Sequence, residues 1–114
     1  MTFPAHWAPE AILFQPPSGW PEPFRSGAFV SFHGSWNREP AQAGFLVAFV
    51  PIVEGQPSPP YQPFATGFAG PAMPAVPAEA QFRPVGLAFG PGNALYVTDD
   101  VHGRVWRIIR TPGR

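Results

Sequence analysis

Proline interrupts this sequence too often for helices to form. The chain has 18 prolines among 114 residues, and no stretch keeps apolar residues at the helical spacing i, i+3, i+4 for two turns without one. A proline inside a helix lacks the N–H that the helical hydrogen bond needs and clashes with the preceding turn. The apolar runs between the prolines are short and rich in β-branched and aromatic residues, which favours strands. We therefore expect an all-β protein made of short strands and many turns.

The composition indicates a folded domain despite its many turn-forming residues. Proline and glycine contribute 18 and 12 residues, a share that also occurs in disordered chains. Eleven Phe, four Trp and two Tyr argue against disorder, because disordered chains are poor in aromatic residues. At 114 residues, the chain is at most one small domain or a piece of a larger one.

Charge and residue usage exclude several functional classes. The formal net charge is zero and only 12% of the residues are charged, so we expect no nucleic-acid partner and no anionic membrane surface. The chain has no cysteine and no lysine, which removes disulfides, thiolate zinc sites, cysteine nucleophiles and Schiff-base chemistry. No apolar run is long enough to span a membrane. Residues 1–20 lack the features of a secretory signal peptide.

The expected strands repeat in order along the chain. Each copy reads strand, turn, strand, polar loop, strand, and the first copy adds a fourth strand at 61–68, which Pro63 confines to a sheet edge. Four short antiparallel strands per repeat form the blade of a β-propeller. The matching strands are 9–14 with 84–89, 28–30 with 94–97, and 45–50 with 105–109. The whole chain is therefore predicted to be a partial propeller, with one blade at 6–68 and an incomplete, three-stranded blade at 83–110.

Polar residues are concentrated in the loops that lie on one face of such a blade. Successive strands of a meander reverse direction, so the loop between the second and third strands and the segment before the first strand share a face. The residues in these connections are His6, Trp7, His33 to Arg38, Arg83, Asp99, Asp100 and His102. The opposite face receives proline-rich turns. The long loop at 69–80 is interpreted as functional or peripheral.

The segment His33–Arg38 is the densest group of polar and aromatic side chains. A plain interpretation is a turn in which Trp36 packs on the sheet while Asn37 and Arg38 satisfy loose backbone groups. We expect Trp36, with a buried ring, and Arg38 to anchor this loop, and His33 to be the more accessible group. Polar loops at this position are also common in propellers generally, so the clustering on one face does not by itself demonstrate a site.

Four segments together resemble a known family. They are His-x-Ala-Pro near the start, Phe-Val-Ser-Phe-His-Gly-Ser-Trp-Asn-Arg at 29–38, Arg-Pro-Val-Gly-Leu-Ala at 83–88 and Ala-Leu-Tyr-Val-Thr-Asp-Asp at 94–100. They resemble the C-terminal part of sorbosone dehydrogenase-like proteins, in the glucose/sorbosone dehydrogenase group of six-bladed propellers that typically bind pyrroloquinoline quinone (PQQ). The resemblance runs from about His6 to Ile109.

The resemblance implies roles for five residues. Arg83 would meet a carboxylate of PQQ, His33 and Arg38 would add polar contacts, and His6 and Trp7 would lie on the rim. An arginine pairs carboxylates through two parallel hydrogen bonds, and an indole offers a flat face to a planar ring. In the soluble glucose dehydrogenase branch a second arginine stands two positions earlier, where this chain has Gln81.

The family's catalytic base and calcium-binding loops come from earlier blades and have no match here. His6, His33 and His102 are the only histidines that this chain offers as a base, and none matches the family's. We therefore expect no metal site in this chain and leave the catalytic residues open. The resemblance implies a sugar or aldehyde substrate and a periplasmic or secreted location.

Two functional hypotheses stay open at this point. The chain is either a fragment of a quinone-dependent sugar or aldehyde dehydrogenase that contributes part of the cofactor-binding face, or a non-catalytic propeller module for binding or assembly. An unrelated β-sandwich lectin would leave the aligned halves unexplained.

Two blades cannot close a ring, so we expect self-association. Three copies would supply the six blades that the family uses, which makes a trimer our expectation. The arm Met1–Ala5 of one copy is expected to pair along Val105–Ile109 of the next.

Overall fold

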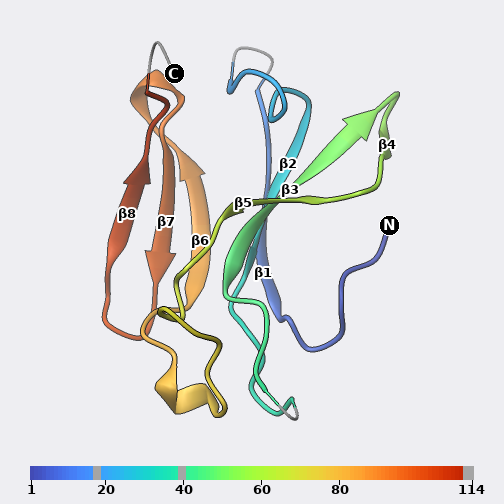
Figure 1. Cartoon of the computed structure of the whole chain (residues 1–114). Helices are drawn as coiled ribbons and strands as arrows, with labels where there is room; N and C mark the ends of the chain where they lie inside the picture. Colours follow the sequence, from blue (N-terminus) through green and yellow to red (C-terminus); the bar gives the residue numbers. More distant parts are fainter. Residues whose placement is uncertain (17–18, 39–40, 112–114) are drawn as a thin grey trace.

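Two antiparallel sheets pack against each other in this computed structural model, which describes residues 1–16, 19–38 and 41–111 (Figure 1). The first sheet contains β1 (Pro9–Phe14), β2 (Gly27–Phe32), β3 (Leu46–Val53), β4 (Gln56–Pro57) and β5 (Gln62–Ala65). The second contains β6 (Pro84–Phe89), β7 (Leu95–Asp99) and β8 (Val105–Ile108). Within the described residues, helical structure is confined to two single 3₁₀ turns, η1 (Pro77–Glu79) and η2 (Pro91–Asn93). The all-β prediction is confirmed, and no helix in the described part could cross a membrane.

Strand order follows the predicted repeat. The first sheet runs β1-β2-β3, and β3 then pairs with β5, while the second runs β6-β7-β8. Strand β3 and the short β4 form a tight hairpin. Glu54 and Gly55 both have positive φ, at 52° and 78°, which matches the twist of a two-residue hairpin. An acidic residue is an uncommon choice for the first of these positions, so the sequence signal for β4 was weak.

Strand β2 is buried along its whole length because both of its faces are covered. Phe29 faces the second sheet and lies in one core with Phe49, Leu95 and Val97. Val30 and its neighbours on alternate positions point the other way, into a second cluster. The period of two along the strand thus divides its apolar residues between two cores.

The N-terminal arm covers the outer face of the first sheet. Phe3 packs on Phe32 and Tyr61, with ring centroids 4.7 and 4.6 Å apart. Trp7 joins the same cluster, with its ring centroid 5.3 Å from that of Phe32. In the single chain, the arm is therefore held by aromatic contacts on its own sheet.

Hydrogen bonds also tie the two sheets together. The hydroxyl of Ser31 on β2 donates a hydrogen bond to the carbonyl of Val85 on β6. The indole N–H of Trp20, in the segment between β1 and β2, donates to the carbonyl of Asn93 in η2 over 2.9 Å. Burial of a backbone carbonyl is favourable only when it is hydrogen-bonded, so these bonds help to fix how the sheets are aligned.

The contact between the sheets should dominate stability. Replacing Phe29 by Ala removes a fully buried ring and should lower the free energy of unfolding by about 3–5 kcal/mol. Phe14→Ala is the matched control, because Phe14 is 63% exposed, and its change should stay within about 1 kcal/mol. Urea denaturation of both variants measures the difference. Equal destabilisation would contradict the placement of the core.

Candidate functional site

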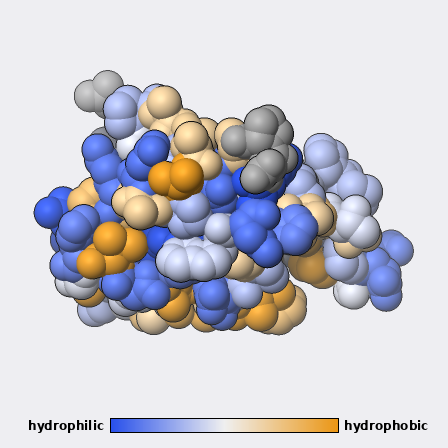
Figure 2. Space-filling model, turned by 90° about the horizontal axis from the view of Figure 1, so that it is seen from below, coloured by the Kyte–Doolittle hydropathy of each residue, from blue (hydrophilic) through white to orange (hydrophobic). Residues whose placement is uncertain are grey.

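The polar connections meet at one end of the molecule. The segments before β1 and β6 and the loops after β2 and β7 all lie at the lower end in Figure 1. Figure 2 views the molecule from below and shows hydrophilic residues gathered around scattered apolar ones. The prediction that these segments share a face is therefore confirmed, and hydrogen bonds join them directly.

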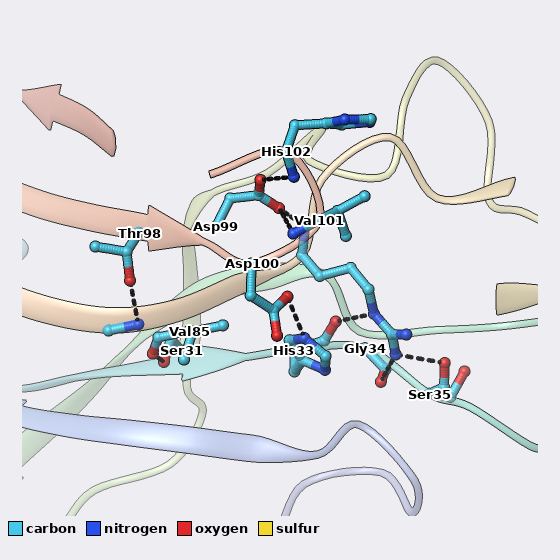
Figure 3. Close-up of polar contacts among 12 residues, drawn as sticks. Ser31, His33, Gly34, Ser35, Val85, Thr98, Asp99, Asp100, Val101 and His102 are labelled. Carbon is cyan, nitrogen blue, oxygen red and sulfur yellow. Dashed lines mark hydrogen bonds and ion pairs between the residues drawn. The ribbon is translucent and has the colours of Figure 1, made fainter. Parts of the chain in front are cut away.

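Arg83 makes most of the contacts that hold this end together. It immediately precedes β6 and is only 3% exposed. Its Nε donates to the carbonyl of His33 at 3.0 Å, and its Nη2 donates to the carbonyls of Gly34 at 2.6 Å and Ser35 at 3.0 Å (Figure 3). Its guanidinium carbon lies 4.7 Å from the centre of the Trp36 ring. A buried cation is stable only when its donors are satisfied, and the 33–35 backbone supplies three acceptors.

Burial lowers the pKa of Arg83 from its ordinary value, and the charges of Asp100 and Glu10 act in the opposite direction. The guanidinium stays charged at neutral pH because the ordinary pKa of arginine lies far above 7.

Local backbone geometry explains why the loop can wrap around this guanidinium. Gly34 has φ of 98°, a conformation that residues with a Cβ rarely adopt. A Cβ on Gly34 would come within 2.3 Å of the Phe45 ring. That ring also lies 5.5 Å from the guanidinium carbon of Arg83. Glycine is therefore needed for Phe45 to close over the loop.

His33 and Asp100 form a second link between the sheets. His33 Nε2 lies 2.8 Å from Asp100 Oδ1 (Figure 3). An ionised carboxylate only accepts hydrogen bonds, so His33 Nε2 is the donor in this contact. The His33 side chain is 19% exposed and that of Asp100 59%. The pair is therefore partly open to solvent.

Asp99 holds together the two segments that contain Arg83 and Asp100, the residues that contact the loop after β2. Its Oδ1 accepts from the backbone N–H groups of Arg83 at 2.7 Å and Val101 at 3.1 Å, and its Oδ2 accepts from His102 N–H at 2.7 Å. Burial by itself raises the pKa of Asp99, but these backbone hydrogen bonds outweigh it and hold the pKa below its ordinary value. The carboxylate form is therefore favoured in the folded protein.

Ser35 and Gln42 support the loop on its buried side, and Gln42 was not among the residues that the sequence singled out. Ser35 Oγ donates to Gln42 Oε1 at 2.7 Å and accepts from the backbone N–H of Ala43 at 2.8 Å. Gln42 Nε2 donates to the carbonyls of Arg38 and Ala75, which joins the loop at 69–80 to this end. A Ser and a Gln seven residues apart form no recognisable motif, so only the tertiary structure reveals the pair.

The structure corrects the expected environment of the loop. Trp36 is 69% exposed, so the prediction that its ring is buried is wrong, and so is the ranking of His33 as more accessible than Trp36. The indole stands over the guanidinium of Arg83 instead of on the sheet, because the loop turns its carbonyls inward. Arg38 is half-buried and contributes its carbonyl to Gln42.

His6 and Trp7 take different positions from the rest of the predicted site. His6 is exposed, whereas the half-buried Trp7 ring packs on the outer face of the first sheet. Their segment still supports the loop through its backbone, since the Trp7 and Ala8 carbonyls accept from the N–H groups of Gly34 and His33. Of the five predicted site residues, the structure brings His33 and Arg83 into direct contact. Among the described residues, no three His, Asp or Glu side chains group as metal ligands would.

Asp99→Asn tests the hydrogen bonds that hold this end. The amide retains one acceptor oxygen and would direct an N–H₂ group at a backbone donor, so we expect a loss of about 1–3 kcal/mol at pH 7. A lowered folded pKa gives stability that is present above the unfolded pKa, about 3.9, and lost as the pH falls through the folded pKa. The gap between wild type and variant should therefore narrow in acid.

Urea denaturation between pH 7 and pH 2 measures this gap. Asp100→Asn removes an exposed carboxylate from the same loop and should change stability by less than about 1 kcal/mol. A gap between wild type and Asp99→Asn that stays constant with pH would contradict the role given to Asp99.

The comparisons with known proteins identify relatives. The TrAA12-like family matches residues 1–111. Two curated relatives, from Coprinopsis cinerea and from its Okayama-7 strain, are both named pyrroloquinoline quinone-dependent pyranose dehydrogenase. Each is 34% identical to this chain over 107 residues, covering 75% of the chain and 13% of the relative. No solved structure matches the chain.

These relatives support a domain of the PQQ-dependent sugar dehydrogenase type, whereas the narrower resemblance to sorbosone dehydrogenase-like proteins stays a prediction. The chain spans 13% of the length of the curated relatives, so it corresponds to a small part of such an enzyme. Since the family match extends over almost the entire sequence, the chain belongs to the TrAA12-like family.

Proposed function

We propose that this chain is part of a quinone-dependent sugar or aldehyde dehydrogenase and contributes to the face that holds PQQ. The observation that carries the proposal is the 34% identity to two enzymes named as PQQ-dependent pyranose dehydrogenases. The convergence of Arg83, His33 and the loop after β2 at one end supports it. Binding groups commonly lie on loops held by a rigid scaffold.

The donor chemistry of this end fits a planar, multiply charged carboxylate. Arg83 and Arg38 are cationic, and His33 and His6 add imidazoles. Nε and Nη2 of Arg83 are engaged by backbone carbonyls, so a carboxylate of the cofactor would have to meet this guanidinium through Nη1. When bound, PQQ would supply the two-electron oxidation, while the protein binds and orients it.

Arg83 would therefore act on the cofactor in two ways. Its buried positive charge would attract a carboxylate, and its bonds to the 33–35 carbonyls would hold the loop that carries His33 and Arg38. The His33 imidazole would lie on the same face. The proposal assigns neither a catalytic base nor a calcium site to this chain.

The sheets also support a propeller arrangement. Each sheet is a meander, and β6 of the second sheet lies against β1 and β2 of the first. We propose that 6–68 and 83–110 are two blades of a six-bladed propeller in a periplasmic or secreted protein. The non-catalytic module is the second candidate, favoured by the engagement of Arg83 with backbone carbonyls, which is a structural role.

Titration of the full chain with PQQ in the presence of calcium tests the proposed function. We expect saturable binding, and Arg83→Ala should weaken it by roughly tenfold to a hundredfold, the loss of a charge-assisted pair. Arg110→Ala is the matched control, because Arg110 is exposed near the opposite end. Melting temperatures are measured alongside, because Arg83 also holds the loop.

Two results would count against this assignment. Equal PQQ affinity in wild type and Arg83→Ala would remove Arg83 from the cofactor site. A folded wild-type chain that binds no PQQ would favour the non-catalytic module.

We also propose that isolated chains self-associate, with a trimer as the expected product. Val105 and Ile109 are 61% and 55% exposed along the β8 segment, and Ile12 and Phe14 are 60% and 63% exposed on β1. Among the described strands, β8 pairs only with β7, which leaves an edge for the arm of another copy. Pairing there requires that the arm give up its contacts with Phe32 and Tyr61 on its own sheet.

Sedimentation of the purified chain should give three times the monomer mass of 12.4 kDa. Val105→Asp should shift the distribution toward monomer, because a charge on an edge strand opposes strand pairing. A stable monomer at micromolar concentration would contradict the assembly.

A further inference from the structure

Trp36 is exposed to a degree that is unusual for an indole. Its exposed fraction is 69%, the highest among the large apolar residues that the structure shows at the surface. Tryptophan is highly buried on average, so an exposed one in a polar loop requires a reason. The sheets do not supply it, because both clusters of core residues are complete without Trp36.

The exposed ring is nevertheless held in place. The guanidinium of Arg83 lies against one face, 4.7 Å from the ring centre, in a contact that attracts the cation to the negative face of the ring. Arg83 is itself fixed by three backbone carbonyls. With one face on Arg83 and more than two-thirds of the residue exposed, the other face of the indole is open to solvent.

We propose that the open face of Trp36 is a stacking subsite for a pyranose ring. The axial C–H bonds on one face of a pyranose carry partial positive charge and are attracted to the negative face of an indole. Hydroxyl groups at the ring edge need polar partners, and the exposed Asn37 and Asp100 lie on the same end of the molecule. A ring that is already oriented loses little entropy on binding. This inference rests on the proposed function, which names a sugar as the substrate. It adds the residue that would contact the sugar ring.

Trp36, and not Trp7, is assigned the stacking role because the two rings lie in different environments. Trp7 was the expected rim residue, yet its ring lies within the cluster of Phe3, Phe32 and Tyr61. Its Nε1 is buried and has no hydrogen-bond partner among the described residues. Trp7 therefore presents no face to a ligand, whereas Trp36 does.

Nuclear magnetic resonance of the full ¹⁵N-labelled chain tests the subsite with methyl β-glucopyranoside as the probe. The four Trp residues give four indole N–H signals, and Trp36→Phe assigns that of Trp36 by its absence. We expect a saturable shift of the Trp36 indole and of the Asn37 amide. Trp36→Ala should weaken the affinity read from Asn37 at least tenfold, while Trp36→Phe, which retains an aromatic face, should lose less.

Sorbitol is the matched control ligand, because it carries the hydroxyl groups without a ring, and it should leave the Trp36 signal unchanged. A wild-type chain that shows no pyranose-dependent shift, an equal shift with sorbitol, or unchanged affinity in Trp36→Ala would each overturn the subsite. So would loss of PQQ binding in Trp36→Ala with pyranose binding intact, which would place the quinone on this ring. Pyranose binding through Trp36 in a chain that binds no PQQ would instead count against the proposed function alone.

Discussion

The polar end of this protein depends on one buried cation. Arg83 comes from the start of the second sheet, yet its guanidinium is bonded to three consecutive carbonyls in a loop of the first sheet. Without that cation, the loop would hold these carbonyls close together with no donor to satisfy them, at a cost of about 1–3 kcal/mol for each one left buried. Neither sheet can therefore form this end alone, and the site exists only where the sheets meet.

Two consecutive acidic residues connect that cation to the rest of the second sheet. Asp99 accepts the backbone N–H of Arg83, while Asp100 pairs with His33 on the loop that Arg83 holds. Because β7 ends at Asp99, the carboxylates are placed by the rigid strand that precedes them. The position of the His33 imidazole is thus coupled to the packing of β7 against the first sheet, through Leu95 and Val97.

The sequence predicted the strands and the shared face well, because both depend on local signals. The short apolar runs bounded by turn residues identify the strands, and a meander leaves little choice about which loops lie together. The sequence did not predict the environment of Trp36, because the spacing of residues in a loop does not reveal which residues their side chains contact. That partner, Arg83, lies 47 residues later in the chain. Gln42 was missed for the same reason, since its backbone acceptors at Arg38 and Ala75 become neighbours only in the folded chain.

In the loop after β2, the backbone bonds to Arg83, while the exposed side chains are available to contact a ligand. His33, Gly34 and Ser35 contribute carbonyls to Arg83. The φ of Gly34 and the Phe45 ring exclude a larger residue at position 34, and the Ser35 hydroxyl is bonded to Gln42. Trp36 and Asn37 project their side chains outward and are not needed for the two apolar clusters. The surface that a ligand meets can therefore change at these two positions while the Arg83 contacts that shape the loop stay the same. Such a separation lets one scaffold present different binding surfaces, because stability and recognition depend on different atoms.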